Sequence, residues 1–204
     1  MKLPILNSSV IVVDTSFLKR VIKDNHDFYS DLYPGREFKD ISLIDMIRSI
    51  AMTSGAINKN EPVSVIFYFK LDNSILPFTS DPKDVFIFND FVNRPINLKF
   101  DDCVFSFASL FADPESDDNH RYLEEFSQLL TSIASNSNTS NISIIVDDIY
   151  FEDTFLMFNE LFNKKFVIYR STETEMYLPE PPKFWNVNLD YIIADTMGVD
   201  ENEI

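Results

Sequence analysis

The sequence is poor in glycine, cysteine and histidine, and these shortages exclude several classes of function. Its 204 residues include three glycines, one cysteine and two histidines. The glycines lie too far apart to form a dinucleotide fingerprint or a phosphate-binding P-loop, so we expect no nucleotide cofactor. The single cysteine allows neither an internal disulfide nor a cysteine-based metal site, which favours a reducing, cytoplasmic compartment.

Long apolar runs and an excess of positive charge are also missing. No segment approaches the roughly 18 uninterrupted apolar residues of a membrane helix, so we expect no membrane association. Seventeen lysines and arginines stand against 33 acidic residues, which gives a formal net charge of −16. This charge repels phosphate and disfavours nucleic acid without excluding it. A basic protein partner or a small substrate held by a divalent metal ion fits the charge better. A homodimer would instead be indicated by an exposed aromatic edge of the sheet.

Apolar residues, by contrast, are plentiful. They make up 45% of the chain and include 20 phenylalanines and 8 tyrosines, each of which buries a large surface in a core. We therefore expect residues 1–204 to form a single α/β domain. Within it, the proline-rich residues 178–187 are expected to form an extended connector to a C-terminal helix, because proline excludes helix there.

The apolar pattern alternates between short continuous runs and helical stripes. Such alternation predicts a three-layer α/β domain with a mostly parallel central sheet flanked by helices, Rossmann-like in architecture. Residues 142–170 form the clearest unit, a strand, a helix and a second strand, which implies a parallel pair with a right-handed crossover. Further expected elements are strands at 10–13 and 62–71 and helices at 15–25, 43–54 and 121–135. The tail 188–204 is expected to form a final helix with an acidic end.

The segment 84–111 is rich in phenylalanine and valine. Its composition predicts one or two further strands. Phe86, Phe88, Phe105 and Phe107 occupy alternate positions, so we expect their side chains to face the core.

Acidic residues follow two of the predicted strands. Asp14 ends the first strand, and Asp147 and Asp148 follow the strand at 142–146. If these strands are neighbours, their carboxylates meet at one edge of the sheet, where Mg²⁺ or Mn²⁺ could bind and activate water. Asp14 also precedes a predicted helix, so capping of that helix is an equally physical role for its side chain.

Three segments resemble PIN-domain proteins and the related NYN group. They are "VIVVDTSFL", "IIVDDIYFEDTFLMFNELFNKKFVIY" and "LDYIIADTMG". The resemblance implies that the three-layer architecture is PIN-like. Members of this superfamily are usually metal-dependent ribonucleases with a four-carboxylate site. The resemblance implies Asp14 as the first metal ligand, Asp147 or Asp148 as the late strand-end ligand and Asp190 as the helix-start ligand. Asp45 would stand in for the mid-chain acid.

Two functions follow from these observations. The segment of Asp190 comes after the 147–170 unit, whereas in the PIN superfamily it precedes that unit, and basic residues for binding substrate are few. Together with the acidity of the chain, this order favours an intracellular interaction module that keeps the PIN-like fold without robust catalysis. The alternative is a Mg²⁺- or Mn²⁺-dependent ribonuclease that uses Asp14, Asp147 and Asp148.

Overall fold

The computed structural model describes residues 3–58, 61–70, 82–113, 119–147, 151–171 and 185–199. A seven-stranded sheet runs through its centre in the order β3-β4-β2-β1-β5-β6-β7. The strands are β1 (Ser9–Asp14), β2 (Val63–Phe69), β3 (Ile96–Phe100), β4 (Cys103–Phe111), β5 (Asn141–Ile145), β6 (Lys165–Arg170) and β7 (Trp185–Asn188). The helices are α1 (Thr15–Leu32), α2 (Leu43–Thr53), α3 (Pro82–Asn93), α4 (Asn119–Ala134), α5 (Glu152–Leu161) and α7 (Leu189–Thr196).

The sheet is mostly parallel, as the sequence predicts. Every pairing is parallel except that of the edge strand β3 with β4. Counted in chain order, the six parallel strands lie in the sequence 3-2-1-4-5-6, which is the order of doubly wound α/β folds. β1 is therefore central and pairs with β5, Val13 opposite Ile145. The two strands whose acids were expected to meet are neighbours.

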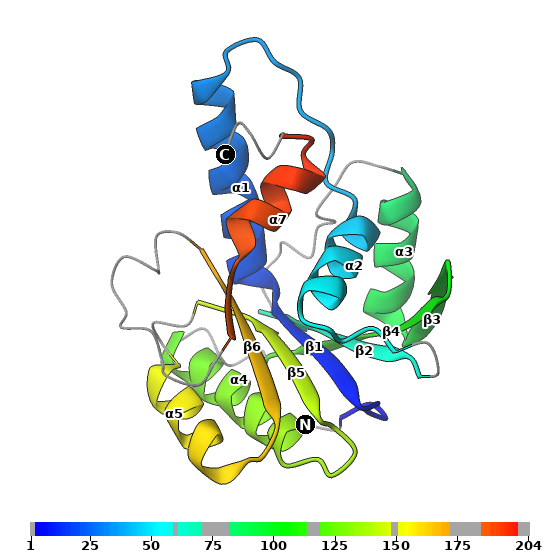
Figure 1. Cartoon of the computed structure of the whole chain (residues 1–204), viewed down its shortest axis with the longest axis vertical. Helices are drawn as coiled ribbons and strands as arrows, with labels where there is room; N and C mark the ends of the chain where they lie inside the picture. Colours follow the sequence, from blue (N-terminus) through cyan, green and yellow to red (C-terminus); the bar gives the residue numbers. More distant parts are fainter. Residues whose placement is uncertain are drawn as a thin grey trace.

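Helices cover both faces of the sheet and enclose two apolar cores (Figure 1). Strand residues alternate between the cores: Ile11 and Val13 belong to the core under α1, α2, α3 and α7, while Val10 and Val12 face α4 and α5. The central strands β1 and β2 are buried along their whole length. Their continuous apolar runs suit strands that are covered on both sides.

Local signals set the ends of α2 where the sequence predicts them. The Ser42 hydroxyl accepts a hydrogen bond from the backbone N–H of Asp45 and caps the first turn. Beyond the last turn, Gly55 adopts φ +65°, a left-handed conformation in which a side chain is strained.

The prediction for 84–111 is partly wrong. β3 and β4 supply the two expected strands, but residues Pro82–Asn93 form helix α3. On that helix Phe88 and Phe91 are buried, whereas Phe86 is 68% exposed. The spacing of three that brings Phe88 and Phe91 onto one face is a helical repeat, and it overrides the alternation of Phe86 with Phe88.

The predicted C-terminal helix is present as α7, and it follows directly on β7. Its last expected residues, 200–204, lie outside the described residues. The proline-rich part of the expected connector, 178–184, lies outside the described residues, and its last predicted positions belong to β7. Across the described ranges, the helices are too short or too polar to cross a lipid bilayer.

Candidate functional site at the carboxyl ends of β1 and β5

A cavity opens where the two central strands β1 and β5 end. After β1 the chain passes into α1 on one face of the sheet, and after β5 it passes into α5 on the other face. Such a divergence of connections leaves a crevice beyond the strand ends, the usual place for ligands in doubly wound folds. The cavity has a volume of about 430 Å³. We call it the switch-point pocket, and its lining residues are Asp14, Ser16, Phe17, Arg20, His120, Tyr122, Leu123, Asp147 and Phe151.

Asp14 lies at the base of this pocket and caps helix α1. Its Oδ1 accepts hydrogen bonds from the backbone N–H groups of Ser16 (2.9 Å) and Phe17 (3.3 Å). A third bond to Oδ1, 2.7 Å long, comes from the hydroxyl of Tyr122 on α4. The capping role that the sequence left open for Asp14 is therefore realised.

The environment of Asp14 disfavours its charge. The residue is only 5% exposed, and this burial is the main reason why the pKa of its carboxyl group is raised above 3.8. The bonds from Tyr122 and from the two backbone N–H groups favour the ionised form, and the nearby charge of Asp147 opposes it. Burial and the charge of Asp14 also raise the pKa of Tyr122, so the tyrosine hydroxyl stays protonated as a donor.

Asp147 faces the same pocket from β5 and is paired with a cation. Because Val13 lies opposite Ile145, Asp147 follows one residue beyond the level of Asp14. Its carboxylate contacts the guanidinium of Arg20 on α1 at 2.5 Å. The Arg20 guanidinium also lies over the ring of Phe17, 5.4 Å from the ring centroid. Asp147 is 15% exposed and Arg20 is 49% exposed, so the pair lies at the pocket mouth.

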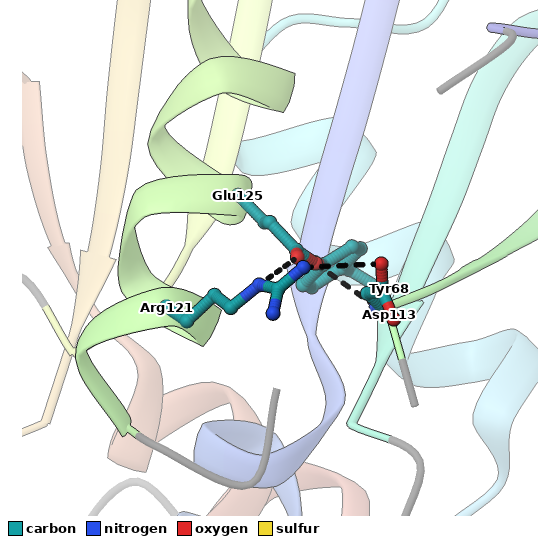
Figure 2. Close-up of polar contacts among 4 residues, drawn as sticks. All are labelled: Tyr68, Asp113, Arg121 and Glu125. Atoms are coloured by element: carbon teal, nitrogen blue, oxygen red, sulfur yellow. Dashed lines mark hydrogen bonds and ion pairs between the residues drawn. The ribbon is translucent and has the colours of Figure 1, made fainter. Parts of the chain in front are cut away.

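A second polar cluster fastens α4 to the sheet beside the pocket (Figure 2). Glu125 Oε2 accepts hydrogen bonds from the Tyr68 hydroxyl (3.1 Å) and from the backbone N–H of Asp113 (3.0 Å). Arg121 forms two ion pairs in this cluster: its Nε lies 3.5 Å from Glu125 Oε1, and its Nη2 lies 3.3 Å from Asp113 Oδ2. The Tyr68 ring also packs against the Tyr122 ring, with centroids 5.2 Å apart. This cluster fixes the turn of α4 from which Tyr122 reaches Asp14.

Of the five acids named as candidate metal ligands, the structure brings together two, Asp14 and Asp147. Asp148 lies outside the described residues. Asp190 sits elsewhere, because its carboxylate accepts a 2.6 Å hydrogen bond from Asn25 on α1. Asn25 comes 11 residues after Asp14, a distance of about 16 Å along the helix axis at about 1.5 Å per residue.

The described side chains do not make up the predicted metal site by themselves. Mg²⁺ and Mn²⁺ prefer several oxygen ligands around one ion. Within the part of the chain that the structure describes, no three acidic, histidine or cysteine side chains are arranged to share an ion. Asp45, the proposed mid-chain acid, is exposed in the first turn of α2 and does not line the pocket.

Two residues that shape the pocket, Tyr122 and Arg20, were not predicted from the sequence. The helical stripe of α4 showed that this helix packs on the sheet, but it did not indicate which strand end Tyr122 would meet. Arg20 lies one helical turn after Ser16, so its place on the pocket side of α1 follows once Ser16 is located. Comparison with protein families, curated proteins and solved structures finds no match to this chain.

Proposed function

We propose that this chain is a PIN-like α/β domain that acts as an interaction module and binds its partner in the switch-point pocket. In this proposal Asp14 and Asp147 serve recognition and not metal-dependent hydrolysis. The observation that carries it is the state of the two carboxylates. Each lines the pocket, and each is already bonded to the protein: Asp14 to Tyr122 and the start of α1, and Asp147 to Arg20.

The form of the pocket supports binding. A volume of about 430 Å³ lies within the range of ligand sites, which are mostly apolar with a few placed polar groups. Phe17, Phe151 and Leu123 supply the apolar walls. The polar groups come from the two carboxylates and from Ser16, Arg20, His120 and Tyr122. The net charge of −16 on the whole chain favours the approach of basic partners.

Selection from a displayed library of random peptides tests the proposal, with two tryptophan variants as the matched pair. Ser16→Trp fills the pocket mouth from an exposed position on α1, and Ser132→Trp adds the same ring to an exposed position on α4 outside the lining. We expect peptides that bind the parent chain and Ser132→Trp and lose binding to Ser16→Trp. Equal binding to both variants would overturn the proposal.

A divalent-metal-dependent ribonuclease is the second candidate, favoured by the meeting of Asp14 and Asp147 at one pocket. A bound ion would raise the melting temperature with concentration, as ligand linkage requires. Thermal melts with Mg²⁺ or Mn²⁺ therefore compare the parent chain with Asp14→Asn and Asp147→Asn. A rise that both variants abolish, together with metal-dependent cleavage of single-stranded RNA, would establish the nuclease in place of the module.

A further inference from the structure

The switch-point pocket already contains one guanidinium group, that of Arg20. This group contacts the Asp147 carboxylate at 2.5 Å and lies over the Phe17 ring at 5.4 Å. A carboxylate on one side and an aromatic face on the other are the two surfaces that guanidinium groups prefer, through paired hydrogen bonds and cation–π attraction. The side chain is nevertheless 49% exposed, so solvent competes for the contact and weakens it.

The second carboxylate of the pocket, that of Asp14, is more buried than Asp147, and the ion pair of Arg20 is with Asp147. All hydrogen bonds that the described residues make to the Asp14 side chain go to Oδ1, and none of the donors is a cation. The aromatic residues Tyr122 and Phe151 line the same space. A cation that enters the pocket would therefore meet the rings of Tyr122 and Phe151 and a second carboxylate besides Asp147, with His120 as a further lining residue.

We infer that the switch-point pocket receives the guanidinium group of an arginine from a basic protein partner, which displaces Arg20 from Asp147. Arg20 then acts as an internal competitor that occupies the mouth of the site until the partner arrives. This inference rests on the proposed interaction module and specifies the chemistry of its ligand. The charge of −16 favours the approach of a basic chain, and the two carboxylates disfavour a phosphate-bearing ligand at the same place.

Nα-acetyl-arginine amide and its neutral isostere, Nα-acetyl-citrulline amide, are the probes, and saturation-transfer NMR measures their affinity. Arg20→Gln removes the competitor, and Arg48→Gln is the matched control. Arg48 is 44% exposed and pairs with Asp101 at 2.8 Å, on a surface away from the lining residues. Asp147→Asn and Ser16→Trp test the pocket itself, and urea unfolding establishes that each variant is folded.

We expect the arginine probe to bind the parent chain and the citrulline probe to bind much less. Arg20→Gln should tighten arginine binding about two- to fivefold, because an exposed ion pair contributes little and its loss frees Asp147. Arg48→Gln should leave the affinity unchanged, and Asp147→Asn should weaken it at least fivefold. Ser16→Trp should abolish binding.

Three results would overturn the inference. Equal arginine binding to the parent chain and Ser16→Trp would show general attraction to an acidic surface. Weaker binding to Arg20→Gln, with binding of inorganic phosphate to the parent chain, would identify Arg20 as part of an anion site. Peptides selected in a Ser16-dependent way that lack basic residues would refute the arginine ligand while leaving the interaction module intact.

Discussion

Two substitutions of Asp14, one by asparagine and one by alanine, separate the contribution of its charge to stability from that of its hydrogen bonds. Both variants remove a buried carboxylate, but only asparagine keeps an oxygen that can cap α1 and accept the Tyr122 hydroxyl. Asparagine and aspartate are about equally good as N-caps. The difference in unfolding free energy between the two variants therefore isolates the acceptor from the charge.

The structure sets the size of this difference. Loss of an N-cap costs about 0.5–2 kcal/mol. The Tyr122 hydroxyl is buried against Asp14, and leaving a buried donor without a partner costs about 1–3 kcal/mol. We therefore expect Asp14→Ala to be less stable than Asp14→Asn by about 2–4 kcal/mol. Urea unfolding measures this difference, which corresponds to about 5–15 °C in melting temperature for a domain of this size.

The pH dependence then reports the charge. Because burial raises the pKa of Asp14 above 3.8, the folded protein holds this proton more tightly than the unfolded chain does. Protonated Asp14 therefore adds to the unfolding free energy in full below pH 3.8. This contribution is lost as the pH rises through the raised pKa of the folded protein. Because asparagine carries no charge, Asp14→Asn should become more stable than the parent chain as the pH rises through the raised pKa of Asp14. The difference in unfolding free energy should persist at neutral pH. Equal losses in both variants at neutral pH would refute the argument, since they would show that the negative charge itself stabilises the fold.

Four other substitutions test individual hydrogen bonds and one turn of the fold, each by urea unfolding. Tyr122→Phe should lower the unfolding free energy by about 1.5–3 kcal/mol, because Tyr122 donates to a buried carboxylate. Tyr68→Phe should lower it by only about 1 kcal/mol, because Tyr68 donates to the more exposed Glu125. A larger loss for Tyr68→Phe than for Tyr122→Phe would contradict this account of the two hydrogen bonds. Asp84→Ala removes the carboxylate that accepts a 2.6 Å hydrogen bond from the buried Leu43 N–H, and it should lower the unfolding free energy by about 1–3 kcal/mol. An unchanged urea midpoint would show that this hydrogen bond does not stabilise the folded protein. Gly55→Ala should cost about 1 kcal/mol because φ is +65° and the added Cβ meets Lys165 Nζ at 3.3 Å, and a neutral result would mean that the turn readjusts.

The sheet could be predicted because its strands carry a strong local signal. A parallel strand buried on both faces is a short continuous apolar run, and β1, β2 and β5 all have this form. The order of the strands in the sheet was harder to predict. The adjacency of β1 and β5 entered only as a condition of the hypothesis that their carboxylates meet. Helix α3 was missed because its phenylalanines satisfy a period of two over the first few positions, and burial of Phe88 and Phe91 decides the matter only in three dimensions.

The pocket was harder to predict than the sheet because its bonds join distant parts of the chain. Tyr122 and Asp14 are 108 positions apart, and Arg20 and Asp147 are 127 positions apart. No local repeat encodes such pairs, since they depend on where each helix crosses the sheet. Asp14 and Asp147 were accessible because a strand end is a local feature, whereas the residues that bond to them are not.

Capping and the proposed ligand recognition are compatible roles for Asp14, because capping uses only one of its two carboxylate oxygens. The fold uses Oδ1, which takes all three hydrogen bonds from the described residues, and asparagine supplies the same oxygen. Folding alone therefore gives no reason for a buried charge whose pKa is raised by desolvation. A cation in the pocket does give one, since its attraction offsets the desolvation of the carboxylate. Binding of the arginine probe should accordingly stabilise the parent chain more than Asp14→Asn, even though Asp14→Asn is the more stable protein without it.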